Sequence, residues 1–103
     1  MSVRQLPSHT HPLPRNEQSI GILPYDLATL AQEHSLGYDE GTDNLGRYRF
    51  AAIELANGQP AWIVKYDVDA NPGSLVYVDG KADVGQAEAA LLETFGLRRE
   101  ELL

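Results

Sequence analysis

The dipeptide Asn57-Gly58 constrains the fold more than any other feature of this sequence, because it separates two strand-like runs. The runs, residues 46–55 and 60–67, are rich in the aromatic and β-branched side chains that strands favour. A two-residue type I′ turn needs positive φ at both central positions, and Asn-Gly meets that requirement best. The sequence therefore predicts an antiparallel β-hairpin with its turn at Asn57-Gly58.

The turn also predicts which side chains share a face of the hairpin. With Asn57 and Gly58 as the turn, Ile53 lies opposite Trp62, and strand alternation assigns the other residues. One face then holds Arg49, Ala51, Ile53, Trp62, Val64 and Tyr66, and the other holds Tyr48, Phe50, Ala52, Ile63, Lys65 and Asp67. Neither face is cleanly polar, although an antiparallel sheet with one wet face alternates sharply. Either helices cover both faces, or one face meets another chain, or a β-bulge shifts the register.

Signals on both sides of the hairpin complete an α+β fold. A third strand is expected over residues 74–79, after the turn-forming run Asn71-Pro72-Gly73. Apolar residues at helical spacing predict helices over residues 24–36 and 83–95. The expected fold is a three-stranded antiparallel β-meander packed with two helices, in the order α-β-β-β-α.

Residues 1–18 are expected to form an extended or disordered arm that precedes a single globular domain over residues 19–103. Pro7, Pro12 and Pro14 disfavour a helix and cannot donate hydrogen bonds to a sheet. The segment also holds too few apolar residues to become ordered on its own.

The charge balance limits the partners of this chain. Its 103 residues include 8 Lys and Arg against 15 Asp and Glu, which gives a formal net charge of −7. Nucleic acids and anionic membranes need a basic footprint, so neither is an expected partner, whereas a basic protein is. The chain has no cysteine, which excludes disulfides and thiolate metal sites, and we expect a cytoplasmic protein.

The motifs for catalysis, metals and cofactors are missing from the sequence, which favours a protein that is not an enzyme. The nearest approach is the run Asp67-Val-Asp69-Ala-Asn71, which begins like a calcium-binding EF-hand loop. The Gly and Glu that such a loop requires are replaced by Pro72 and Val78. We therefore expect a solvated turn here, and neither a metal nor a cofactor.

Three surfaces are candidates for function. The main expectation is a non-enzymatic interaction or regulatory module that self-associates as a dimer, because large exposed apolar faces usually mark interfaces. The residues assigned to self-association are Phe50, Ala52 and Ile63.

Two alternatives stay open beside self-association. The first is an acidic inhibitor, of the immunity or antitoxin type, that neutralises a basic partner protein. Its binding residues would be Asp39, Glu40, Asp43, Asp67 and Asp69. The second is a small ligand-binding protein or enzyme, with a pocket near Arg49, Trp62, Tyr66 and Tyr48.

Overall fold

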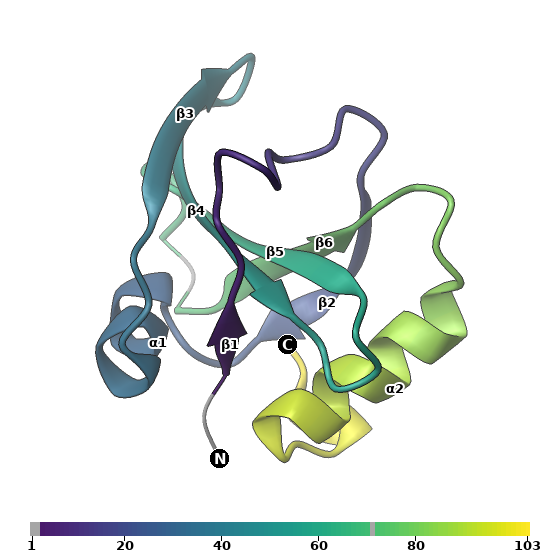
Figure 1. Ribbon diagram of the computed structural model, residues 1–103. Coiled ribbons are helices and arrows are strands. Elements are labelled where there is room, and N and C mark those ends of the chain that lie inside the picture. The colour runs from purple at the N-terminus through teal and green to yellow at the C-terminus, as the bar shows by residue number, and fades with distance from the viewer. Residues whose placement is uncertain (1–2, 71) are drawn as a thin grey trace.

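The computed structural model describes residues 3–70 and 72–103, and it shows an α+β fold with a six-stranded antiparallel sheet and two helices (Figure 1). The three predicted strands are present as β4 (Gly46–Glu54), β5 (Pro60–Tyr66) and β6 (Ser74–Val78), and they pair in that order. They make up only half of the sheet. The prediction of a three-stranded sheet in the order α-β-β-β-α is therefore wrong in detail.

Three further strands surround the predicted ones. They are β1 (Arg4–Gln5), β2 (Gln18–Leu23) and β3 (Asp39–Asp43). The sheet order is β1-β4-β5-β6-β2, and β3 also pairs with β4. Local sequence hides two of these strands, because β1 is very short and β3 is acidic and contains glycine, both unfavourable for a strand on its own. Pairing with neighbours in the folded chain overrides those local preferences.

The β4–β5 hairpin has a different turn from the predicted one. The Gly58 N–H donates to the Leu55 carbonyl at 2.8 Å, and the Leu55 N–H donates to the Gln59 carbonyl at 2.9 Å. The turn therefore contains three residues, and only its third, Gly58, has a positive φ, of 88°. This is the hairpin in which a type I turn is followed by a glycine bulge.

The longer turn shifts the register by one residue. Ala52, not Ile53, lies opposite Trp62, and Ala51 lies opposite Ile63. A one-residue shift moves every side chain of one strand to the other face relative to its partner strand. The predicted composition of the two faces is therefore wrong: Trp62 shares one face with Ala52, and Ile63 shares the other with Ala51.

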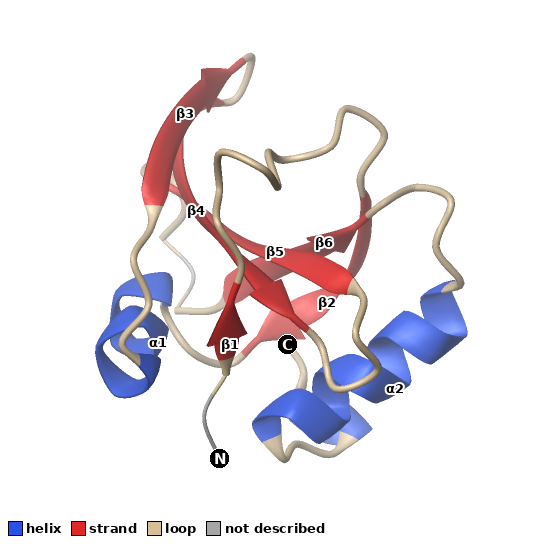
Figure 2. Ribbon diagram, viewed as in Figure 1, coloured by secondary structure: helices blue, strands red, loops and turns tan. Residues whose placement is uncertain are grey.

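The first face of the sheet carries the main core and both helices. Helices α1 (Leu27–His34) and α2 (Val84–Phe95) lie on the same side of the sheet, as Figure 2 shows. A short 3-10 helix, η1 (Arg99–Glu101), follows α2. The largest fully buried residues of this core are Leu23, Leu27, Leu30, Ile53, Ile63, Leu91, Val76 and Val78.

The helix ends follow from local capping. The Asp83 carboxylate accepts a hydrogen bond from the Gln86 N–H at 2.9 Å and caps the start of α2. Helix α1 begins at Leu27, later than predicted, and Ser35, in a left-handed conformation with a φ of 56°, ends it before Gly37. Across the described part of the chain, neither helix is long and apolar enough to span a bilayer.

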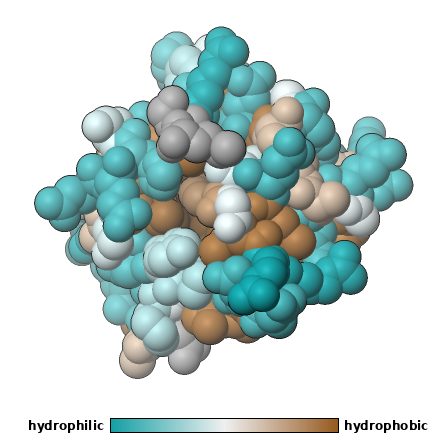
Figure 3. Space-filling view, turned by 90° about the horizontal axis from the view of Figure 1, so that it is seen from below, coloured by the Kyte–Doolittle hydropathy of each residue, from teal (hydrophilic) through white to brown (hydrophobic). Residues whose placement is uncertain are grey.

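The two helices leave a hollow of about 290 Å³ between them, lined in part by Leu30, His34 and Phe95. The rings of His34 and Phe95 meet edge to face across it, with centroids 5.8 Å apart. Seen from this lower side, the molecule has a hydrophobic area surrounded by hydrophilic residues (Figure 3).

The second face of the sheet is covered by the N-terminal arm, here defined as residues 3–17. Leu6 and Leu13 of the arm pack against a second cluster that is centred on Ala52, Trp62 and Val64. The Trp62 indole N–H donates to the backbone carbonyl of His11 at 2.8 Å. The hairpin is apolar on both faces because helices cover one face and the chain's own arm covers the other.

Candidate functional site

The outer edge of β3 is an exposed edge of the sheet. Within the described residues β3 pairs only with β4, so its other edge has no strand beside it. Every residue of β3 except Gly41 is exposed, and three of the five carry carboxylates: Asp39, Glu40 and Asp43. Figure 1 shows β3 at the margin of the molecule, with its outer edge facing away from the other strands.

Packing and hydrogen bonds on the β4 side hold this acidic strand in place. The Tyr48 ring lies over Gly41, so close that a Cβ atom on Gly41 would come within 2.5 Å of the ring carbon Cζ. The Asp43 carboxylate closes the β3–β4 turn by accepting from the Leu45 N–H at 2.8 Å. The same carboxylate accepts from the Tyr66 hydroxyl at 2.5 Å.

The tyrosines beside β3 are held in their protonated form. Burial, together with the hydrogen bond to Asp43 and the charge of Asp43, raises the pKa of Tyr66 well above its usual range. Burial and the carboxylates of Glu17 and Asp43 also raise the pKa of Tyr77. The Tyr66 hydroxyl therefore stays a neutral hydrogen-bond donor to Asp43 in alkaline solution.

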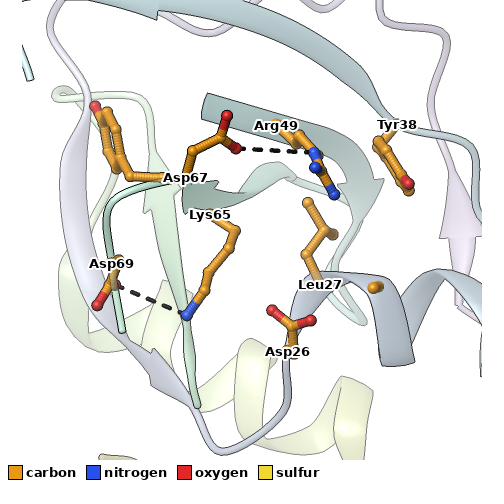
Figure 4. A pocket seen from close by; sticks show the side chains of 9 residues that line it. Asp26, Leu27, Tyr38, Arg49, Lys65, Asp67 and Asp69 are labelled. Carbon is orange, nitrogen blue, oxygen red and sulfur yellow. Dashed lines mark ion pairs between the residues drawn. The ribbon is translucent and has the colours of Figure 1, made fainter. Parts of the chain in front are cut away.

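A charged pocket of about 240 Å³ adjoins the start of β3 and lies between the sheet and α1 (Figure 4). The sheet contributes Arg49 from β4 and Lys65 from β5, and Tyr38 immediately precedes β3. The residues that line the pocket are Asp26, Leu27, Ala28, Tyr38, Arg49, Lys65, Tyr66, Asp67 and Asp69.

The cations of the pocket already interact with neighbouring groups. The Arg49 Nε lies 3.9 Å from a carboxylate oxygen of Asp67, and the Arg49 guanidinium lies 5.7 Å from the centre of the Tyr38 ring. The Lys65 Nζ lies 3.9 Å from a carboxylate oxygen of Asp69 and donates to the Gly73 carbonyl at 2.8 Å. Both ion pairs are long, so they stabilise the pocket only weakly.

Asp26 gives the pocket its negative balance. It precedes the first residue of α1 but makes no capping hydrogen bond with its side chain. Its carboxylate points into the pocket in Figure 4, and within the described residues it has no ion-pair partner. Three carboxylates therefore face two cations, and the pocket favours an additional positive group.

The structure brings some of the predicted ligand-binding residues together and separates others. Arg49 and Tyr66 line the charged pocket. Trp62, Tyr48 and Tyr66 belong to the cluster under the arm, on the other face of the sheet, although Tyr66 also contributes to the lining of the pocket. The predicted pocket thus exists near Arg49, but Trp62 is not part of it.

The five carboxylates of the predicted acidic surface fall into two neighbouring groups. Asp39, Glu40 and Asp43 lie on β3, whereas Asp67 and Asp69 line the charged pocket. Asp67 and Asp69 also belong to the EF-hand-like run, whose third oxygen-bearing residue, Asn71, lies outside the described residues. Among the described residues, no group of three or more His, Asp or Glu side chains is placed to hold a metal ion.

The predicted self-association face does not exist as one surface. Ile63 is fully buried in the core beneath the helices. Ala52 is fully buried and Phe50 is half-buried, and both lie on the other face, under the arm. The one-residue shift of register is the reason, because it places Ile63 opposite Ala51.

Sequence reasoning missed the three polar residues Asp26, Tyr38 and Lys65 of the pocket. They come from a helix start, a loop and a strand, and no sequence spacing connects them. Only the pairing of β3 with β4 and the packing of α1 bring them together. Comparison with protein-family models, with curated proteins and with solved structures found no match, so the assignment of this site rests on the chain itself.

Proposed function

We propose that the protein is a non-enzymatic binding module and that the outer edge of β3 receives an extended, basic segment of a partner protein. The observation that carries this proposal is an exposed edge strand with carboxylates at three of its five positions. Natural proteins usually protect an exposed edge, because its free N–H and C=O groups pair with other strands. Addition of a partner's strand to such an edge is a common mode of peptide recognition.

The charge of β3 selects the class of partner. Two copies of this chain that paired through β3 would bring Asp39, Glu40 and Asp43 of one copy against the same residues of the other. Such like-charge contacts disfavour association. A segment rich in Lys or Arg gains attraction along the same edge, and the formal net charge of −7 would speed the encounter.

The charged pocket adds a place for one side chain of that segment. It adjoins the start of β3 through Tyr38, and its carboxylates exceed its cations by one. A Lys or Arg side chain that follows the edge toward α1 would meet the carboxylate of Asp26. The edge therefore supplies backbone pairing, and the pocket supplies selectivity for a basic residue.

A charge reversal on β3 tests this proposal. Asp39→Lys changes an exposed side chain that makes no ion pair within the described residues, so the fold should be unaffected. Glu93→Lys on α2 changes the net charge equally at a distant exposed site and serves as the matched control. We would measure the binding of a peptide of alternating lysine and valine by isothermal titration calorimetry.

At low ionic strength we expect Asp39→Lys to weaken binding roughly fivefold or more, and Glu93→Lys to weaken it much less. Binding to the unaltered protein should also weaken as salt is added, because the contacts are exposed to solvent. Equal losses for the two variants would mean that the peptide responds only to net charge, and the β3 site would be rejected.

A further inference from the structure

The arm covers a face that is strongly aromatic. Seven partly buried hydrophobic residues surround the buried centre of this face, and two of them, Leu6 and Leu13, belong to the arm itself. The other five are Tyr48, Phe50, Tyr66, Leu75 and Tyr77. Without the arm this face would expose a large apolar patch to water, which folded proteins avoid. The face therefore needs a cover at all times.

Several separate contacts hold the arm in place, and Val3 at its start is buried in the main core. Strand β1 pairs with β4 through only two residues, Arg4 and Gln5, and the Leu6 N–H donates to the Ala52 carbonyl at 2.9 Å. The Gln5 side chain bonds the backbone of Gly37 through both its amide nitrogen and its amide oxygen. All of these contacts join the arm to the body of the protein, so an identical arm from a second copy would make them equally well.

The connection between the arm and β2 is short and is fixed at its far end. The Asn16 backbone packs against Gly80, where a Cβ atom would come within 2.1 Å of the Asn16 carbonyl oxygen. The Gln18 side-chain amide donates to the carbonyls of Asp79 and Ala82 at 3.1 and 2.8 Å. The hinge of the arm is thus confined to Pro14 and Arg15, and the fixed φ of proline favours an extended chain there.

We propose that two copies of the chain exchange their arms, so that each arm covers the aromatic face of the other copy. Exchange preserves every contact between arm and body and leaves neither face bare, which makes it a low-cost route to a dimer. Residues 1–18 contain Arg4, Arg15 and Glu17, so the arm is formally basic and the remainder of the chain is acidic. This attraction favours contact between arm and body whether the arm belongs to the same copy or to the other copy. This dimer is independent of the β3 edge, which stays open in both copies.

A pair of introduced cysteines tests the exchange, since the chain has none of its own. Arg4 and Glu54 are direct partners across β1 and β4, and their side chains form an ion pair at 3.1 Å. Facing residues of an antiparallel pair lie within the range that a disulfide spans. Thr42→Cys with Arg47→Cys is the matched control, because these partners lie within one hairpin of β3 and β4 and cannot exchange through the arm.

After oxidation at increasing protein concentration, we expect Arg4→Cys/Glu54→Cys to yield covalent dimers in a rising fraction, and the control pair to remain monomeric. Monomers alone from the first pair at every concentration, or equal dimer fractions from both pairs, would overturn the proposal. Light scattering of the unaltered chain gives a check without substitutions. A dimer that forms at high concentration and separates slowly on dilution supports exchange, whereas a monomer throughout contradicts it.

Discussion

Tyr66 shows how one side chain joins the β3–β4 hairpin to the sheet. Its hydroxyl donates to Asp43 while its ring packs against Tyr48, with ring centroids 5.4 Å apart. The raised pKa of Tyr66 means that the folded state favours the protonated form more strongly than the unfolded state does. The stabilisation is therefore complete below about pH 10 and is lost as the pH rises above the usual tyrosine value.

We expect a spectrophotometric titration of the tyrosines to show that Tyr77 and, more strongly, Tyr66 ionise at a higher pH in the folded protein than in the unfolded protein. Tyr66→Phe lacks this group, so its free energy of unfolding should fall less steeply with pH above that value. The measurement is a series of urea denaturation curves at increasing pH. Identical pH slopes for the unaltered protein and for Tyr66→Phe would contradict the assigned role of Tyr66.

At the scale of elements, the β4–β5 hairpin shows what the sequence reveals and what it conceals. Asn57-Gly58 correctly places a turn between two antiparallel strands. Whether that turn has two or three residues depends on whether Asn57 takes a positive φ, and Asn tolerates both signs. The Thr94 hydroxyl of α2 accepts from the Ala56 N–H at 2.9 Å and thereby supports the longer turn. Nothing in the sequence near the hairpin predicts this contact from a distant helix.

The register predicts the effect of changing Ile63. Because Ile63 is fully buried in the main core, Ile63→Ala should lower the free energy of unfolding by roughly 2–4 kcal/mol. Val68→Ala, at a residue that is 76% exposed, should change it little and serves as the control. Urea denaturation provides the measurement. A loss at Ile63 as small as that at Val68 would mean that Ile63 is on the surface, as the predicted two-residue turn would place it.

Strand β3 was missed for a different reason. Its sequence, Asp39-Glu-Gly-Thr-Asp43, is typical of a solvated loop, and its strand conformation comes from pairing with β4. The sequence therefore predicts an acidic binding surface here, but it does not predict that these carboxylates lie on the edge of a strand. The edge is a property of the sheet and becomes visible only once all pairings are known.

At the scale of the whole molecule, the chain supplies its own cover for a sheet that is apolar on both sides. The sequence predicts helices over both hairpin faces, a second chain on one face or a bulge, and it assigns the arm, with its three prolines and few apolar residues, no part in covering the sheet. Two leucines and one bond from Trp62 to a backbone carbonyl secure the arm across the second face. With both faces covered in this way, the edge of β3 and the charged pocket are the surfaces that best fit a partner.

The position of a bound basic peptide on the protein would show whether β3 is the binding edge. We would titrate the lysine–valine peptide into isotopically labelled protein and follow the backbone amide signals by NMR. The largest shifts should fall on residues 38–43 and on the lining of the charged pocket, and amides of β3 should become protected from hydrogen exchange. Shifts centred on α2 or on the face beneath the arm, with β3 unchanged, would show that the peptide does not bind at the β3 edge.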